Sequence, residues 1–156
     1  MDFDALVAAG RTESFGEHHF LTLLSLEAAR YGVVQFAQAA DLGWALVKDG
    51  ELVAFRAGTE KHFIELLEHP RSDIEAELER SVRTHGLPAE VAWSFPAIDL
   101  VRAMIATGSP HFTRVALAWL LPTELRELRS EIQRVADDPS MLVPVRELAR
   151  RLIVPG

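Results

Sequence analysis

A two-residue turn at Asp49 and Gly50 constrains the fold of this chain more than any other feature of the sequence. Asp-Gly is typical of a turn in which both residues take positive φ, and apolar residues flank it on both sides. Residues 44–56 (WALVKDGELVAFR) therefore predict a β-hairpin. With the turn centred there, Lys48 pairs with Glu51 and closes the hairpin with opposite charges.

Both faces of this hairpin are apolar. One face carries Trp44, Leu46, Val53 and Phe55, and the other carries Ala45, Val47, Leu52 and Ala54. A hairpin with one wet face would alternate apolar and polar residues, so we expect both faces to be covered. Most of the remaining chain reads as helix, and we expect helices to supply that cover.

The helices are predicted from apolar periodicity and from capping residues, glycines and prolines at their ends. The expected helices cover residues 2–9, 14–31, 33–40, 60–69, 72–85, 96–107, 110–121, 124–136 and 144–153. Residues 90–95 (EVAWSF) alternate and predict a third strand. The expected fold is α+β and predominantly helical. In it, helices cover a small two- or three-stranded sheet (hairpin 44–56 plus strand 90–95), and a C-terminal four-helix region follows.

The chain has 156 residues, the size of one ordinary domain, and no stretch in which the composition changes abruptly. We expect a single domain over residues 1–156. Within it, residues 1–95 would hold helices and the small sheet, and residues 96–156 would form a helical subdomain packed on them. The following large aromatic residues are expected in the core: Trp44, Phe55, Trp93, Phe95, Phe112 and Trp119.

The absence of cysteine excludes disulfides, thiolate zinc sites and cysteine nucleophiles, and it suits a reducing compartment. The N-terminal sequence MDFDAL is acidic, unlike the basic start of a signal peptide. The longest apolar run covers residues 115–121, far short of the roughly 20 residues that cross a bilayer. These features predict a cytoplasmic protein that does not enter membranes.

A net charge of −7 argues against binding to nucleic acid, which needs a basic face. The charge is unevenly distributed, because residues 59–80 hold seven acidic residues against three basic ones, a net charge of −4. Glu75 and Glu79 in this segment are candidate partner-binding residues. A basic cluster on the last expected helix supplies the other candidates, which are Arg146, Arg150 and Arg151.

Glu27 and Arg114 are the two charges that interrupt apolar helical surfaces in this reading. Glu27 lies within the apolar side of the expected helix 14–31, and Arg114 lies on the otherwise apolar helix 110–121. One interpretation is an internal ion pair of Glu27 with Arg30 or Arg114. The other is a ligand-binding acid near a cleft.

No metal or cofactor site is expected. His62, Glu65 and His69 share a helical face, but that face points away from the apolar residues of the same helix. The sequence has no GxSxG, GxGxxG or GxxxxGK[ST] motif, so neither a serine nucleophile elbow nor a phosphate-binding loop is indicated.

These observations favour a non-enzymatic protein–protein interaction module, such as an adaptor, regulatory partner or immunity-type inhibitor, that uses charged helical surfaces. The alternative is an enzyme or small-ligand-binding protein with a pocket near Glu27, between the sheet and the N-terminal helices. A protein partner is expected under the first hypothesis, and a homo-oligomer is compatible with both.

Overall fold

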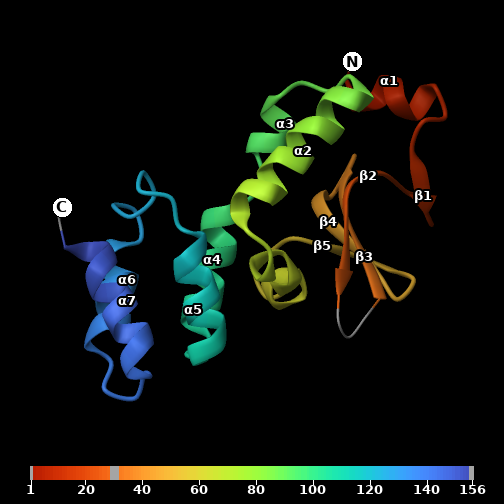
Figure 1. Cartoon of the computed structure of the whole chain (residues 1–156). Coiled ribbons are helices and arrows are strands. Elements are labelled where there is room, and N and C mark those ends of the chain that lie inside the picture. Colours follow the sequence, from red (N-terminus) through yellow and green to blue (C-terminus); the bar gives the residue numbers. More distant parts are fainter. Residues whose placement is uncertain (1, 29–31, 155–156) are drawn as a thin grey trace. The chain divides into compact units, whose positions relative to one another are not determined.

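The computed structural model describes residues 2–28 and 32–154 and divides the chain into two compact units (Figure 1). Unit 1 spans Met1–Phe95 and contains a β-sheet with helices, and unit 2 spans Pro96–Gly156 and is helical. The single-domain organisation stays a prediction, because it concerns how the two units are joined.

The sheet of unit 1 has five strands, so the predicted small sheet of two or three strands is wrong. The strands are β1 (Glu13–Phe15), β2 (His18–Ala28), β3 (Gly32–Ala39), β4 (Gly43–Lys48) and β5 (Glu51–Ala54). They pair in chain order, β1-β2-β3-β4-β5, and every neighbouring pair is antiparallel. The fold remains α+β, but it is built on an antiparallel meander.

The predicted hairpin is confirmed as β4 and β5, with Lys48 opposite Glu51. The two turn residues have positive φ, 50° at Asp49 and 73° at Gly50. This is the geometry of the primed turn that the Asp-Gly sequence favours, because its twist matches that of the paired strands.

The helices predicted over residues 14–31 and 33–40 are strands instead. A β-bulge between Thr22 and Leu24 explains the error, because it inserts Leu23 as an extra residue in β2. Leu21, Leu23 and Leu24 are all buried, so the leucines of this strand recur at the spacing of a helix. Without Leu23, successive side chains of β2 would alternate between the two faces of the sheet as in an ordinary strand, so this single extra residue conceals the strand pattern in the sequence.

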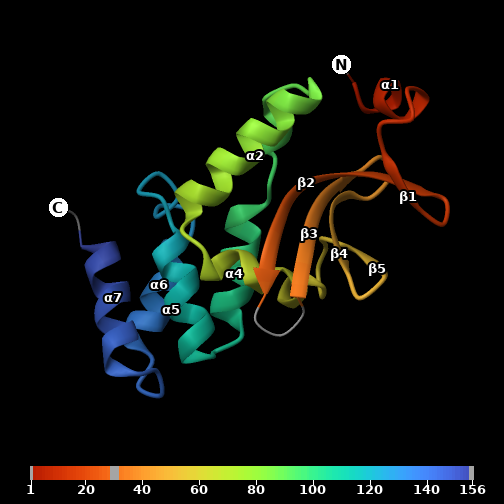
Figure 2. The same ribbon diagram turned by 45° about the vertical axis from the view of Figure 1, so that its right-hand side comes forward.

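One face of the sheet packs against helical segments, and we call it the helix-covered face. Phe63 of the 3₁₀ segment η1 (Glu60–Glu68) lies 5.9 Å from Phe36 and 4.9 Å from Phe55 between ring centroids. Helix α2 (Arg71–His85) packs along β2, as Figure 2 shows, and buries Ile74, Leu78 and Val82. Burial of these apolar side chains is the main force that holds the helices to the sheet.

The opposite face carries a smaller apolar cluster. Phe20, Ala37 and Ala39 are buried in it, and Leu42, Val47 and Leu52 pack against them. Every member comes from a strand or from the connection between β3 and β4. The expectation that helices cover both faces is therefore wrong for this cluster, since the sheet side chains cover one another.

The strand predicted over residues 90–95 is also wrong, because the segment begins with the short helix α3 (Glu90–Trp93). Two backbone bonds, from Val91 N to the Pro88 carbonyl and from Ser94 N to the Glu90 carbonyl, close its turns. Residues 90–95 alternate in polarity, but no neighbouring strand pairs with them, so the alternation alone does not make them extended. Pro88 and Ala89 come directly before the segment and favour the start of a helix.

The remaining predicted helices are present with changed bounds, and the one predicted over residues 124–136 begins only at Arg129, after a series of turns. Helix α1 (Phe3–Ala8) is capped by Asp2, whose carboxylate accepts a hydrogen bond from Ala5 N. Unit 2 contains α4 (Ala97–Ala106), α5 (Pro110–Trp119), α6 (Arg129–Asp137) and α7 (Val143–Ile153). In it α4 packs on α5 and α6 on α7, and α5 also contacts α7. Among the described helices, none combines the length and apolar character needed to cross a lipid bilayer.

Candidate functional site

Glu27 and Arg114 do not occupy the buried positions that the sequence predicted. Glu27 lies on β2 opposite Val33 and is exposed, because the segment is a strand and not an amphipathic helix. Arg114 is exposed on α5 in unit 2. The expected pocket between the sheet and N-terminal helices loses its basis, since residues 14–31 form no helix in the described range. Arg30 lies outside the described residues.

The arginines of α7 have different environments. The guanidinium of Arg150 donates a hydrogen bond from Nη2 to the Ala136 carbonyl over 3.1 Å, at the end of α6. This contact satisfies a carbonyl of the last helical turn. Arg146 is half-buried, and Arg151 is exposed. A role of this cluster in partner binding stays a prediction.

The two candidate glutamates lie on the exposed side of α2, one helical turn apart. Glu75 accepts a hydrogen bond from Arg71 Nε at 2.7 Å, so its charge is already paired. For Glu79 the structure gives no ion pair with any residue in the ranges 2–28 and 32–154. An exposed carboxylate without an internal partner is available to an external one.

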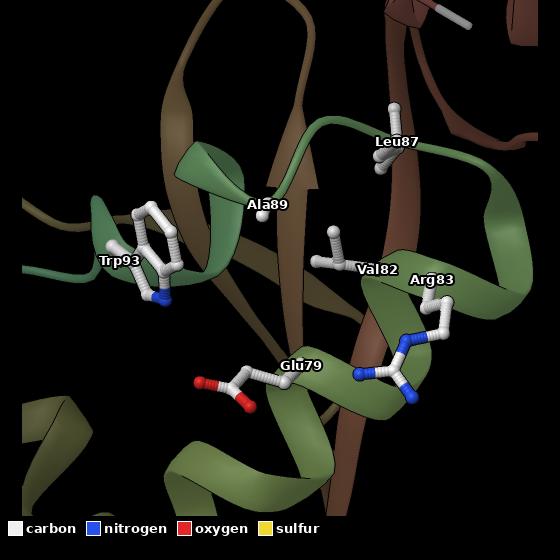
Figure 3. Close-up of a pocket in the computed structure, with 6 residues that line it drawn as sticks. All are labelled: Glu79, Val82, Arg83, Leu87, Ala89 and Trp93. Atoms are coloured by element: carbon white, nitrogen blue, oxygen red, sulfur yellow. The ribbon is translucent and has the colours of Figure 1, made fainter.

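A hollow of about 220 Å³ opens beside Glu79. It is lined by Glu79, Val82, Arg83, Leu87, Ala89 and Trp93 (Figure 3). Trp93 is 68% exposed, and its ring stands at one end of the hollow. Glu79 extends its carboxylate on the side of Trp93, and Arg83 lies on the other side, beneath Leu87. An apolar floor thus lies between an exposed indole, one acid and one base.

Trp93 is held on a rigid support. Helix α2 ends at Gly86, whose φ of 70° reverses the chain toward α3. The indole Nε1 of Trp44 donates to Ser94 Oγ over 3.1 Å, and the Ser94 hydroxyl donates to the Val91 carbonyl over 2.8 Å. Phe95 packs edge-on against Trp44, with ring centroids 5.2 Å apart. The two contacts with Trp44 fix the end of α3 to the sheet directly after Trp93.

A second hollow, of about 230 Å³, adjoins the first because Leu87 lines both. Its lining consists of Asp2, Phe3, Gln38, Ala39, Ala40, Leu87, Pro88 and Val91. The side-chain oxygen of Gln38 is buried there and accepts no hydrogen bond from the described residues. A buried acceptor of this kind usually has a partner, and Gln38 would have to turn its side chain toward the hollow to accept a hydrogen bond from a group bound there.

A third hollow, of about 270 Å³, lies in unit 2 and is lined in part by Arg102 and Glu131. Arg102 donates to Asp99 at 3.0 Å, to Glu127 at 3.1 Å and to Glu131 at 3.3 Å. The hydrogen bond that Arg102 donates to Glu127, with help from Glu131 and Asp99, raises the pKa of Arg102. The Ser130 hydroxyl and Arg102 lower the pKa of Glu131. Three carboxylates satisfy this arginine, so the network serves to hold the helices together.

Among the described residues, no group of three or more metal-ligating side chains comes together. Sequence reasoning named Glu79 but missed Trp93, which it placed in the core on a strand. The available signal was Pro88 and Pro96 on either side of the segment, which disfavour a long paired strand. Comparison of the chain with protein-family models, curated proteins and solved structures finds no match.

Proposed function

We propose that this chain is a non-enzymatic protein-interaction module, of the adaptor, regulatory or immunity-inhibitor type. Its partner-binding region is the α2–α3 surface, which we define by Glu75, Glu79, Arg83 and Trp93. The observation that carries the proposal is the exposure of Trp93 beside the unpaired carboxylate of Glu79. Tryptophan is enriched among the residues that dominate binding energy at protein interfaces, where it fills or borders a pocket.

The surroundings of Trp93 support this proposal. The adjoining hollow at Gln38 continues the concave surface beyond Leu87, so the recessed area beside Trp93 is larger than the first hollow alone. Residues 59–80, with a net charge of −4, favour a partner with a basic surface and accelerate its association. The lack of cysteine suits the reducing cytoplasm, which is our proposed location.

The test is affinity capture with the tagged full chain from its native cells, carried out in parallel with two variants. Trp93→Ala removes the proposed anchor. Leu142→Ala is the matched control, because Leu142 is an apolar side chain that is 59% exposed, in unit 2. We expect a near-stoichiometric protein that the wild type and Leu142→Ala retain and Trp93→Ala loses. Capture that survives Trp93→Ala, or no capture by the wild type, contradicts the proposal.

A small-ligand-binding function is the second candidate, and the unpartnered oxygen of Gln38 favours it. The chain contains three glutamines, Gln35, Gln38 and Gln133, and no asparagine, so side-chain amide signals in an NMR spectrum are few. A library of small hydrogen-bond donors can be screened against the Gln38 signal, with Gln38→Leu used to assign it. Absence of any hit that moves this signal would remove the second candidate.

A further inference from the structure

We infer that the hollow between Trp93 and Glu79 binds an arginine side chain of the partner protein. This inference rests on the proposed function and specifies the chemistry of its partner. Two groups that attract a cation line the same hollow: an exposed indole side chain and a carboxylate without an ion pair among the described residues. A cation placed there gains both a cation–π contact and a charge-assisted hydrogen bond.

Arginine fits this hollow better than lysine. Its planar guanidinium can stack on the Trp93 ring and donate two parallel hydrogen bonds to the Glu79 carboxylate, whereas an ammonium group is a more strongly hydrated point charge. The floor is formed by Val82, Leu87 and Ala89, which suit the methylene stem of an arginine. The lining therefore matches both parts of the side chain.

Arg83 sets the orientation of the bound side chain. It lines the opposite side of the hollow from Trp93 and is exposed. A guanidinium that moved toward Arg83 would meet a like charge, so repulsion directs it toward Glu79. The hollow therefore attracts a cation at the end with Glu79 and Trp93 and repels it at the end with Arg83.

The support of Trp93 keeps this site formed in the absence of a partner. The Trp44–Ser94 hydrogen bond and the Trp44–Phe95 packing hold α3 against the sheet. A preformed site does not have to be ordered on binding, and this lowers the entropic cost of association.

The probes are three blocked amino acids added to the full-length chain: N-acetyl-arginine methylamide and its citrulline and lysine counterparts. Citrulline keeps the shape of arginine but has no charge. Binding is followed through the indole N–H signals of Trp44, Trp93 and Trp119 in ¹H–¹⁵N spectra. Trp93 is the exposed member of the three, since Trp44 is 7% and Trp119 4% exposed.

We expect the arginine probe to shift the Trp93 signal selectively and to bind about tenfold more tightly than the citrulline probe. Glu79→Gln should remove most of this preference. Trp93→Leu should abolish binding, which is followed in that variant through the backbone amide signals of α2 in the same spectra. Glu17→Gln is the charge-matched control, because Glu17 is exposed in the turn between β1 and β2, and it should leave the preference unchanged. Both site variants change exposed side chains, so unaltered spectra elsewhere will verify that they fold.

Equal binding of arginine and citrulline, a preference that survives Glu79→Gln, or no shift of Trp93 at about 0.1 M probe would overturn the inference. A lysine probe that binds more tightly than arginine would also overturn it. If the probes fail while Trp93→Ala still abolishes capture of a partner, the interaction function stands and the arginine assignment is rejected. If the probes succeed but no partner is captured, the cation site stands and the protein-binding function fails.

Discussion

The indole nitrogen of Trp44 donates a hydrogen bond to the hydroxyl of Ser94 over 3.1 Å. This bond joins the β4–β5 hairpin to Ser94, the residue that follows Trp93. The position of the proposed binding residue therefore depends on a buried side chain that is distant in sequence.

Replacement of Trp44 by Phe should remove this bond and lower the free energy of unfolding by about 1 kcal/mol, apart from any effect of the smaller ring. Ser94→Ala removes the same bond from the other side. Because each single variant already breaks the contact, the double variant should lose less than the sum of the two. Urea unfolding of the four proteins measures this, and strictly additive losses would show that the bond contributes nothing.

Gly50→Val should destabilise the chain by about 1–2 kcal/mol or more, because Gly50 has a φ of 73° and a β-branched residue resists that conformation. Gly50→Asn is the control, since asparagine tolerates positive φ and should cost much less. Thermal unfolding compares the two variants. A valine variant as stable as the asparagine variant would contradict the turn geometry.

The low pKa of Glu131 predicts a pH dependence of stability. The Ser130 hydroxyl and Arg102 favour its charged form in the folded chain, so the unfolded state binds the proton more readily. The stabilisation is present above the ordinary glutamate pKa of 4.5 and is lost as the pH falls through the lower folded-state pKa. Glu131→Gln should therefore flatten the decline in the urea midpoint at acid pH, and Ser130→Ala should flatten it in part. An unchanged profile in both variants would exclude this source of acid sensitivity.

Glu27→Gln and Arg114→Met should each change the free energy of unfolding by less than about 0.5 kcal/mol, because both residues are exposed. Their effects should also add. A buried ion pair would instead cost about 3 kcal/mol or more when one partner is removed. A double-mutant cycle measured by chemical unfolding distinguishes these outcomes.

Binding of the captured partner should weaken as salt rises from about 0.05 M to about 0.3 M, since the acidic residues of α2 would be screened. The change should appear mainly in the association rate measured by surface-based kinetics. Glu75→Gln and Glu79→Gln together should reduce the salt dependence. Affinity that does not respond to salt would remove the electrostatic part of the proposed interaction.

The parts of the fold that depend on local signals could be predicted from sequence. The Asp49-Gly50 turn specifies its own geometry, and the structure reproduces it. Strands β2 and β3 could not be predicted in this way. In β3 the alanines and glutamines favour helix by intrinsic propensity, and pairing with β2 and β4 overrides them.

The candidate site could be predicted only in part, for a similar reason. Glu79 is recognisable from the charge of its segment, but its unpaired state and its proximity to Trp93 depend on the reversal of the chain after Gly86. The exposure of Trp93 follows from the short helix α3, whose buried residue is Ala92. A large aromatic residue on the outside is a tertiary property that composition and periodicity do not reveal.

The bulge in β2 changes which residues of the strand, odd-numbered or even-numbered, point to a given face of the sheet. Before it, the odd-numbered Leu21 lies on the same face as Gln38 of β3, and after it the even-numbered Leu24 and Leu26 lie on the face of Phe36 and Val34. Loss of Leu23 alone would bring the strand into strict alternation and leave every other side chain on its present face. Loss of a residue at a position away from this bulge would invert one end of the strand, and so the bulge is the place in β2 where a change of length preserves the facing of both ends.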